Sequence, residues 1–125
     1  MSCQVSVAEA IPYGSLRWLA PELVAASNYV PTTRATDVWS FGMLSLEVFT
    51  DKVPFSHIRN EANVPIAIRD GPLPTRPEQS ATTRGLSDGL WNLMNSCWKH
   101  DPESRPSMSA IRETIQNTNP MRQCT

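Results

Sequence analysis

The sequence offers few groups that could hold a metal ion, a nucleotide or a reaction intermediate. Its three cysteines, Cys3, Cys97 and Cys124, have neither CxxC nor zinc-like spacing, which indicates reduced thiols. Its five glycines never form the G-x-G-x-x-G pattern of a phosphate-binding loop. The only lysines, Lys52 and Lys99, fall in predicted loop or helix-end positions. We therefore expect no catalytic, cofactor-binding or metal-binding residue in this chain.

Composition and charge restrict the class of protein. Hydrophobic residues make up 40% of the 125 residues, which is typical of one globular domain. Eleven Lys and Arg against twelve Asp and Glu leave a net charge of -1, which argues against nucleic acid or an anionic membrane as a partner. No segment approaches the roughly 18 continuous apolar residues of a membrane helix. We expect a soluble, intracellular, cytoplasmic protein.

Hydrophobic periodicity and capping residues predict a mainly α-helical domain with long loops and little or no strand. Residues 1–19 show no period and predict an irregular segment, after which a short helix begins at Pro21. A helix over 37–50 follows, with Thr36 as its N-cap. Its apolar residues cover most of the helical circumference, so we expect this helix to be buried on nearly all sides.

Three more helices are predicted in the second half of the chain. The first covers about 61–70 and ends at Gly71, but Pro65 requires either a start near Asn63 or a kink. The second helix is predicted over 88–99, with Ser87 as its N-cap, and the third over 107–117, with Ser107 as its cap. A flexible tail at 118–125 follows.

Three separated motifs indicate a family when they are taken together. They are GSLRWLAPE at 14–22, TDVWSFGMLSLEVFT at 36–50 and CWKHDPESRPS at 97–107. In order and approximate spacing they resemble the C-terminal lobe of a protein kinase, most closely in the tyrosine-kinase-like group of serine/threonine kinases. The resemblance implies a partial kinase domain at 20–117, with helices EF, F, G, H and I around a buried helix F. Residues 1–19 would be a remnant of the activation segment.

The resemblance also implies roles for three charged residues. The glutamate of Ala-Pro-Glu pairs with a late arginine in this family, so Glu22 and Arg105 should form a buried bidentate bridge; the alternative is two surface charges in loops. Asp37 matches the helix F aspartate, which accepts hydrogen bonds from the catalytic loop. The alternative for Asp37 is a carboxylate that only favours the helix dipole.

Four residues match the P+1 region, which faces the protein substrate in the family: Gly14, Ser15, Arg17 and Trp18. For Gly14 and Ser15 the alternative is an ordinary turn. Asp51 stands where relatives commonly have glycine, and aspartate tolerates the left-handed backbone better than most residues. The motifs also assign structural roles to three core positions: Trp39, Gly42 and Trp98.

The family function that the resemblance implies is ATP-dependent phosphorylation of protein serine or threonine, or alternatively tyrosine, with Mg²⁺ as a cofactor. Two stretches only imitate the required motifs. HIRN at 57–60 lacks the base aspartate, and SFG at 40–42 has Ser40 in place of a metal-binding carboxylate. The sequence therefore predicts a chain that is inactive by itself.

A second hypothesis is a non-catalytic, pseudokinase-like module that binds another protein. In either case a partner is expected, which would be another protein or the missing half of a kinase domain. Because helix F would lose its usual neighbours, we expect large apolar side chains at the surface and a marginal or partner-dependent fold.

Overall fold

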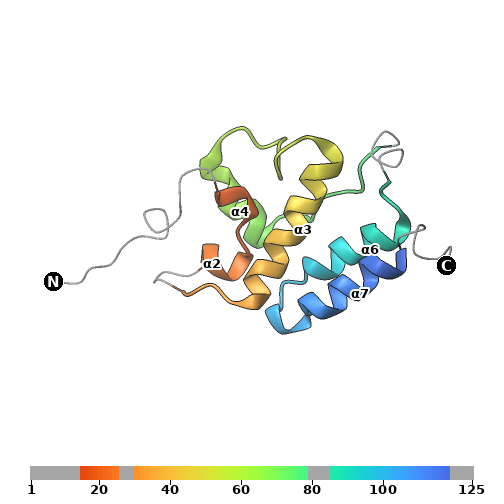
Figure 1. Cartoon of the computed structure of the whole chain (residues 1–125). Coiled ribbons are helices and arrows are strands. Elements are labelled where there is room, and N and C mark those ends of the chain that lie inside the picture. The colour runs from red at the N-terminus through yellow and green to blue at the C-terminus, as the bar shows by residue number, and fades with distance from the viewer. Residues whose placement is uncertain (1–14, 26–29, 79–84, 119–125) are drawn as a thin grey trace.

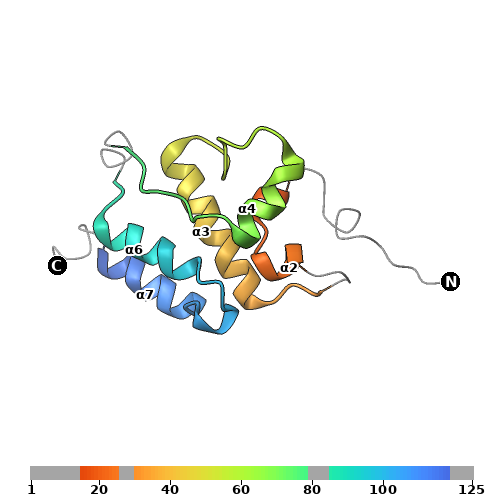
Figure 2. The same cartoon turned by 180° about the vertical axis from the view of Figure 1, so that it is seen from behind.

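The longest helix, α3 (Arg34–Thr50), runs through the middle of the molecule. In the computed structural model, which describes residues 15–25, 30–78 and 85–118, α6 (Asp88–Cys97) and α7 (Met108–Thr118) lie side by side on one flank of α3 (Figure 1). The short helices α2 (Pro21–Ala25) and α4 (Val64–Asp70) occupy the other flank, as the reverse view confirms (Figure 2).

The described residues also form three 3-10 turns: η1 (Leu16–Trp18), η2 (Glu61–Asn63) and η3 (Pro102–Ser104). Within the described residues there is no strand, so the prediction of a mainly α-helical domain is confirmed. The predicted turn around Gly14 and the tail after Thr118 lie outside the described residues.

The start of α3 differs from the sequence prediction. Thr33, not Thr36, is the N-cap: its side chain accepts a hydrogen bond from the Thr36 N–H at 3.3 Å, and its own N–H donates to Thr36 Oγ1 at 2.8 Å. This reciprocal capping box satisfies two amide groups and starts the helix at Arg34. Thr36 is thus the third helical residue, and the predicted helix over 37–50 is three residues too short.

The end of α3 agrees with the expectation for Asp51. Asp51 adopts the left-handed conformation, with φ 57° and ψ 22°, and its N–H donates to the Glu47 carbonyl at 2.8 Å. An aspartate thus takes the C-terminal position that usually favours glycine.

Helix α3 is buried on one side only, whereas the sequence predicted burial on nearly all sides. Its inward residues Val38, Trp39 and Met43 are 0 to 2% exposed. Leu44 and Val48, by contrast, are 53% and 65% exposed. These two residues are four apart and therefore share one helical face. No described element covers that face.

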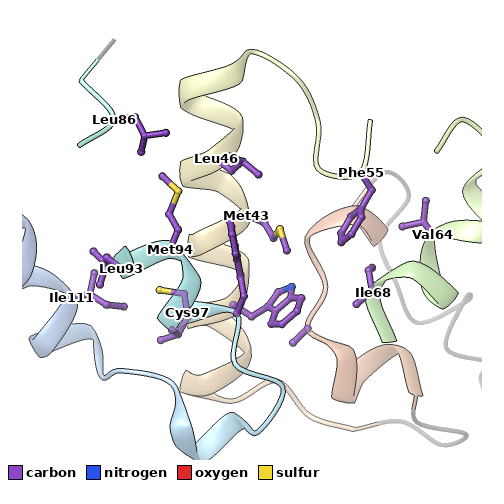
Figure 3. Close-up of a cluster of buried hydrophobic side chains, with 14 residues drawn as sticks. Met43, Leu46, Phe55, Val64, Ile68, Leu86, Leu93, Met94, Cys97 and Ile111 are labelled. Atoms are coloured by element: carbon purple, nitrogen blue, oxygen red, sulfur yellow. The ribbon is translucent and has the colours of Figure 1, made fainter. Parts of the chain in front are cut away.

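The hydrophobic core extends from both flanks of α3 (Figure 3). Leu93, Met94 and Cys97 of α6 and Ile111 of α7 pack on one side of this helix. On the other side, α4 and the loop that follows α3 contribute buried apolar residues: Val64, Ile68 and Phe55. The two helical flanks are therefore joined by one core.

The remaining helix ends refine the predicted boundaries. Pro65 lies in the first turn of α4, so the start near Asn63 is confirmed; η2 precedes that start. Gly71 follows α4 with extended backbone, φ −82° and ψ 172°. Ser87 and Ser107 cap their helices through side-chain oxygens that accept amide hydrogen bonds at 3.2 Å and 3.1 Å. Helix α6 ends at Cys97, two residues before the predicted end.

Candidate functional site

Glu22 and Arg105 form a bidentate ion pair that joins residues 83 positions apart. Arg105 Nη1 and Nη2 donate to Glu22 Oε2 and Oε1 at 2.7 Å and 2.8 Å. The Arg105 side chain is 0% exposed and that of Glu22 is 26% exposed. This geometry matches the bridge that the resemblance implies and differs from two free surface charges in loops.

Further contacts hold the Arg105 guanidinium on its other sides. Its Nη1 also donates to the Ala35 carbonyl at 2.9 Å, and its Nε donates to the Lys99 carbonyl at 2.8 Å. The Trp39 ring lies beside it, with 5.2 Å between the guanidinium carbon and the ring centroid. Arg105 therefore connects α2, the start of α3 and the loop after α6.

Trp18 and Ser40 attach η1 to α3. Trp18 Nε1 donates to Glu47 Oε1 at 3.0 Å, and Ser40 Oγ donates to the Trp18 carbonyl at 2.8 Å. Ser40 thus acts as a structural donor that connects α3 to η1. The two bonds fix the position of η1 along α3.

Arg17, one of the residues that the resemblance assigns to the P+1 region, lies inward in the structure. The residue is only 8% exposed. Its guanidinium donates to the carbonyls of Pro54, Phe55 and Ile58 at 3.2, 2.7 and 2.8 Å. An ion pair with Glu61 Oε1 at 3.4 Å adds partial charge compensation. Arg17 therefore holds η1 against the loop that follows α3.

The other predicted site residues are not gathered around a reaction centre. Gly14 lies outside the described residues, and Ser15 is a half-buried N-cap of η1 without a side-chain capping bond. Asp37 is exposed in the first turn of α3, as its helix-dipole alternative requires. Among the described residues, no group of three or more His, Cys, Asp or Glu side chains could hold a metal ion.

Gly42 of α3 lies against Trp98, the residue that follows the last residue of α6. Trp98 is 0% exposed, and a Cβ placed on Gly42 would lie 2.6 Å from Trp98 Nε1 and 2.9 Å from Cys97 Cβ. Trp91 packs edge-on against Trp98, with ring centroids 5.7 Å apart. The absent side chain at Gly42 thus provides the space for a buried indole.

Cys97 has a buried and weakly acidic thiol. Burial raises the pKa of Cys97 from 9.0 to about 11, while the positive charge of Arg105 has a smaller, opposite effect. Since the thiolate is the reactive form, we expect native Cys97 to react with Ellman's reagent far more slowly at pH 8 than after unfolding in guanidinium. The rate is measured in the Cys3→Ser/Cys124→Ser background, and rapid reaction of the folded protein would contradict the prediction.

The same raised pKa predicts how stability changes with pH. Between pH 9 and about 11 the folded chain keeps the Cys97 proton that the unfolded chain loses. The contribution of this thiol to stability is therefore complete below the unfolded pKa and decreases as pH rises through the folded pKa. Denaturant midpoints measured across this range should fall less steeply for Cys97→Ala than for the parent chain.

Comparison with known proteins identifies the family. Residues 5–115 match the family described as protein tyrosine and serine/threonine kinase. The tyrosine-protein kinase SRK3 of Spongilla lacustris is 33% identical over 103 residues, which cover 82% of this chain and 28% of that protein. The chain belongs to the protein tyrosine and serine/threonine kinase family.

Relatives of both specificities are similar to the chain. Human mitogen-activated protein kinase kinase kinase 7 is 37% identical over 99 residues, or 78% of this chain and 15% of that protein. The Raf homolog serine/threonine-protein kinase of Caenorhabditis elegans is 28% identical over 106 residues, which cover 85% of this chain and 13% of that protein. The chain therefore spans less than a third of the length of these relatives. Within its described residues, no helix is both long enough and apolar enough to cross a membrane.

Sequence reasoning identified the ion pair but missed the contacts of Arg17. The resemblance to the kinase family implied the pairing of Glu22 with Arg105, because both residues lie in motifs that the sequence shows. The partners of Arg17 are backbone carbonyls, which every residue has, so no pattern of residue types indicated them.

Proposed function

We propose that the chain is the C-terminal-lobe part of a serine/threonine kinase domain of the tyrosine-kinase-like group. In this assignment α2, α3, α4, α6 and α7 correspond to helices EF, F, G, H and I. The observation that carries the proposal is the Glu22–Arg105 bridge, because it connects the first and third family motifs in space. The family match over residues 5–115 supports it.

The part of such a domain that this chain contributes is the support for the protein substrate. Arg17 and Trp18 hold η1 against the loop after α3 and against Glu47. In a complete domain that receives ATP and Mg²⁺, this turn would position the substrate segment that follows the phosphorylated hydroxyl. Accurate positioning supplies much of the rate of phosphoryl transfer.

The open face of α3 supports a partner for the chain. Leu44 and Val48 expose apolar surface that none of the described elements covers. In the first version of the proposal, the preceding part of a kinase domain covers this face. The same exposed pair favours the second candidate, a non-catalytic module whose α3 face binds another protein.

Phosphotransfer assays test the proposal. We expect the purified 125-residue chain, given Mg²⁺ and radiolabelled ATP, to transfer no phosphate to casein above a protein-free background. Its sequence has neither the Gly-rich loop nor the metal-binding Asp-Phe-Gly motif. Phosphate transfer by the chain alone would contradict this expectation.

A chimera distinguishes the two candidates. Human mitogen-activated protein kinase kinase kinase 7 would supply the part of its kinase domain that precedes the position corresponding to Leu23, followed by residues 23–118 of this chain. Activity of the chimera, together with its loss in the Arg105→Met chimera, supports the kinase-domain assignment. A folded chimera without activity favours the non-catalytic module.

A further inference from the structure

A groove of about 600 Å³ lies beside the C-terminal end of α3. One wall is formed by the last turn of α3 and by the loop over 52–57; the other is the segment over 72–78. Its volume is within the range of about 300 to 1,000 Å³ that is typical of ligand sites. None of the contacts that define the proposed kinase function requires such a groove.

Apolar and charged residues both line the groove. Phe49 and Leu73 are half-buried, and Val53 is 40% exposed. Lys52 and Arg76 supply two cations, whereas Glu78 is the only carboxylate among the lining residues. Apolar and polar groups also occur together in protein–protein interfaces.

The two cations of the groove differ in how they are compensated. Arg76 Nη1 contacts Asp88, which is itself largely exposed. Among the described residues Lys52 has no side-chain ion pair, and its hydrogen bonds there involve only its backbone. Lys52 is therefore the groove cation that is available to pair with an acidic ligand.

Both walls are held in place before any ligand arrives. Pro72, Pro74 and Pro77 fix three φ angles in a segment without helix or strand, so this wall loses little conformational entropy on binding. On the opposite wall Phe55 has φ 56°, a left-handed conformation unusual for a bulky residue. The Phe55 carbonyl accepts the 2.7 Å bond from Arg17, which stabilises this conformation.

We propose that this groove binds an extended, acidic peptide segment of a partner protein. An apolar side chain of the peptide contacts Phe49 and Val53, and its carboxylates face Lys52 and Arg76. Because Pro54 and Phe55 also accept hydrogen bonds from Arg17, a bound peptide stabilises the loop that holds η1. The groove is thus a docking site next to the substrate-supporting turn.

Two labelled peptides of matched hydrophobicity test the charge requirement with the full chain. The probes are fluorescein-labelled Asp-Asp-Leu-Pro-Phe-Asp-Asp and its counterpart with lysine in place of every aspartate. By fluorescence anisotropy at low salt, we expect the acidic peptide to bind saturably and at least tenfold more tightly. Affinity should fall as salt is added, since Lys52 and Arg76 are exposed. Equal affinity for both peptides, or no saturable binding below 1 mM acidic peptide, would overturn the proposal.

Two charge-reversal variants test the location. Lys52→Glu should weaken binding of the acidic peptide at least fivefold. The matched control is Lys99→Glu, at the other lysine of the chain, which should leave the affinity for the peptide unchanged. Both side chains are exposed, so neither change should alter the melting curve. Equal affinities of Lys52→Glu and the parent chain would overturn the proposal. So would a photo-crosslinking peptide that labels the Leu44–Val48 face in place of residues 72–78.

Discussion

Replacing Arg105 by methionine should lower the free energy of unfolding by about 3 to 5 kcal/mol, because the Glu22 carboxylate loses its bidentate partner. The same change leaves the carbonyls of Ala35 and Lys99 without a donor that now lies 2.8 to 2.9 Å away. Typical domains are stable by about 5 to 15 kcal/mol, so the loss is a large share of the total. Urea denaturation followed by circular dichroism measures it.

An exposed ion pair provides the control for Arg105. Arg69 and Asp70 are in contact at 3.1 Å, but their side chains are 50% and 62% exposed. Arg69→Met should therefore cost less than about 1 kcal/mol, as is usual for surface pairs. If Arg69→Met and Arg105→Met shifted the urea midpoint equally, the bridge would have no special structural role.

Replacing Trp98 by alanine should cost about 3 to 5 kcal/mol, because it leaves a large cavity between α3 and α6. Trp98 is fully buried and packs against Trp91 and the backbone at Gly42. Val48→Ala on the exposed face of α3 is the control and should change stability by less than about 0.5 kcal/mol. Equal denaturation midpoints for the two variants would contradict the assignment of Trp98 to the core.

A double-mutant cycle tests the contact between Gly42 and Trp98 directly. In the parent chain, Gly42→Ala should destabilise by about 1 to 3 kcal/mol because the added methyl overlaps the indole. In the Trp98→Ala background this cost should shrink, although Cys97 Cβ at 2.9 Å preserves part of the overlap. The cycle then gives a coupling energy different from zero. Strict additivity would show that the two sites are independent.

Local sequence signals predicted most of the helices because capping and periodicity act within a few residues. Ser87 and Ser107 satisfy amide groups three positions away, so their caps could be recognised without knowledge of the fold. The predicted start of α3 was wrong because such local signals can point to more than one residue. Thr33 and Thr36 are both acceptable caps, and only the reciprocal bonds between them show that the helix begins at Arg34.

By itself the sequence determined the family and the helical class, because both depend on specific residue types at recognisable spacing. The resemblance to that family then implied the Glu22–Arg105 pair. Only the tertiary structure decided that Arg17 lies inward, that Leu44 and Val48 remain exposed, and that a groove separates α3 from residues 72–78. The physical reason is that backbone carbonyls carry no residue identity, and that burial depends on which elements pack together and not on hydrophobicity alone.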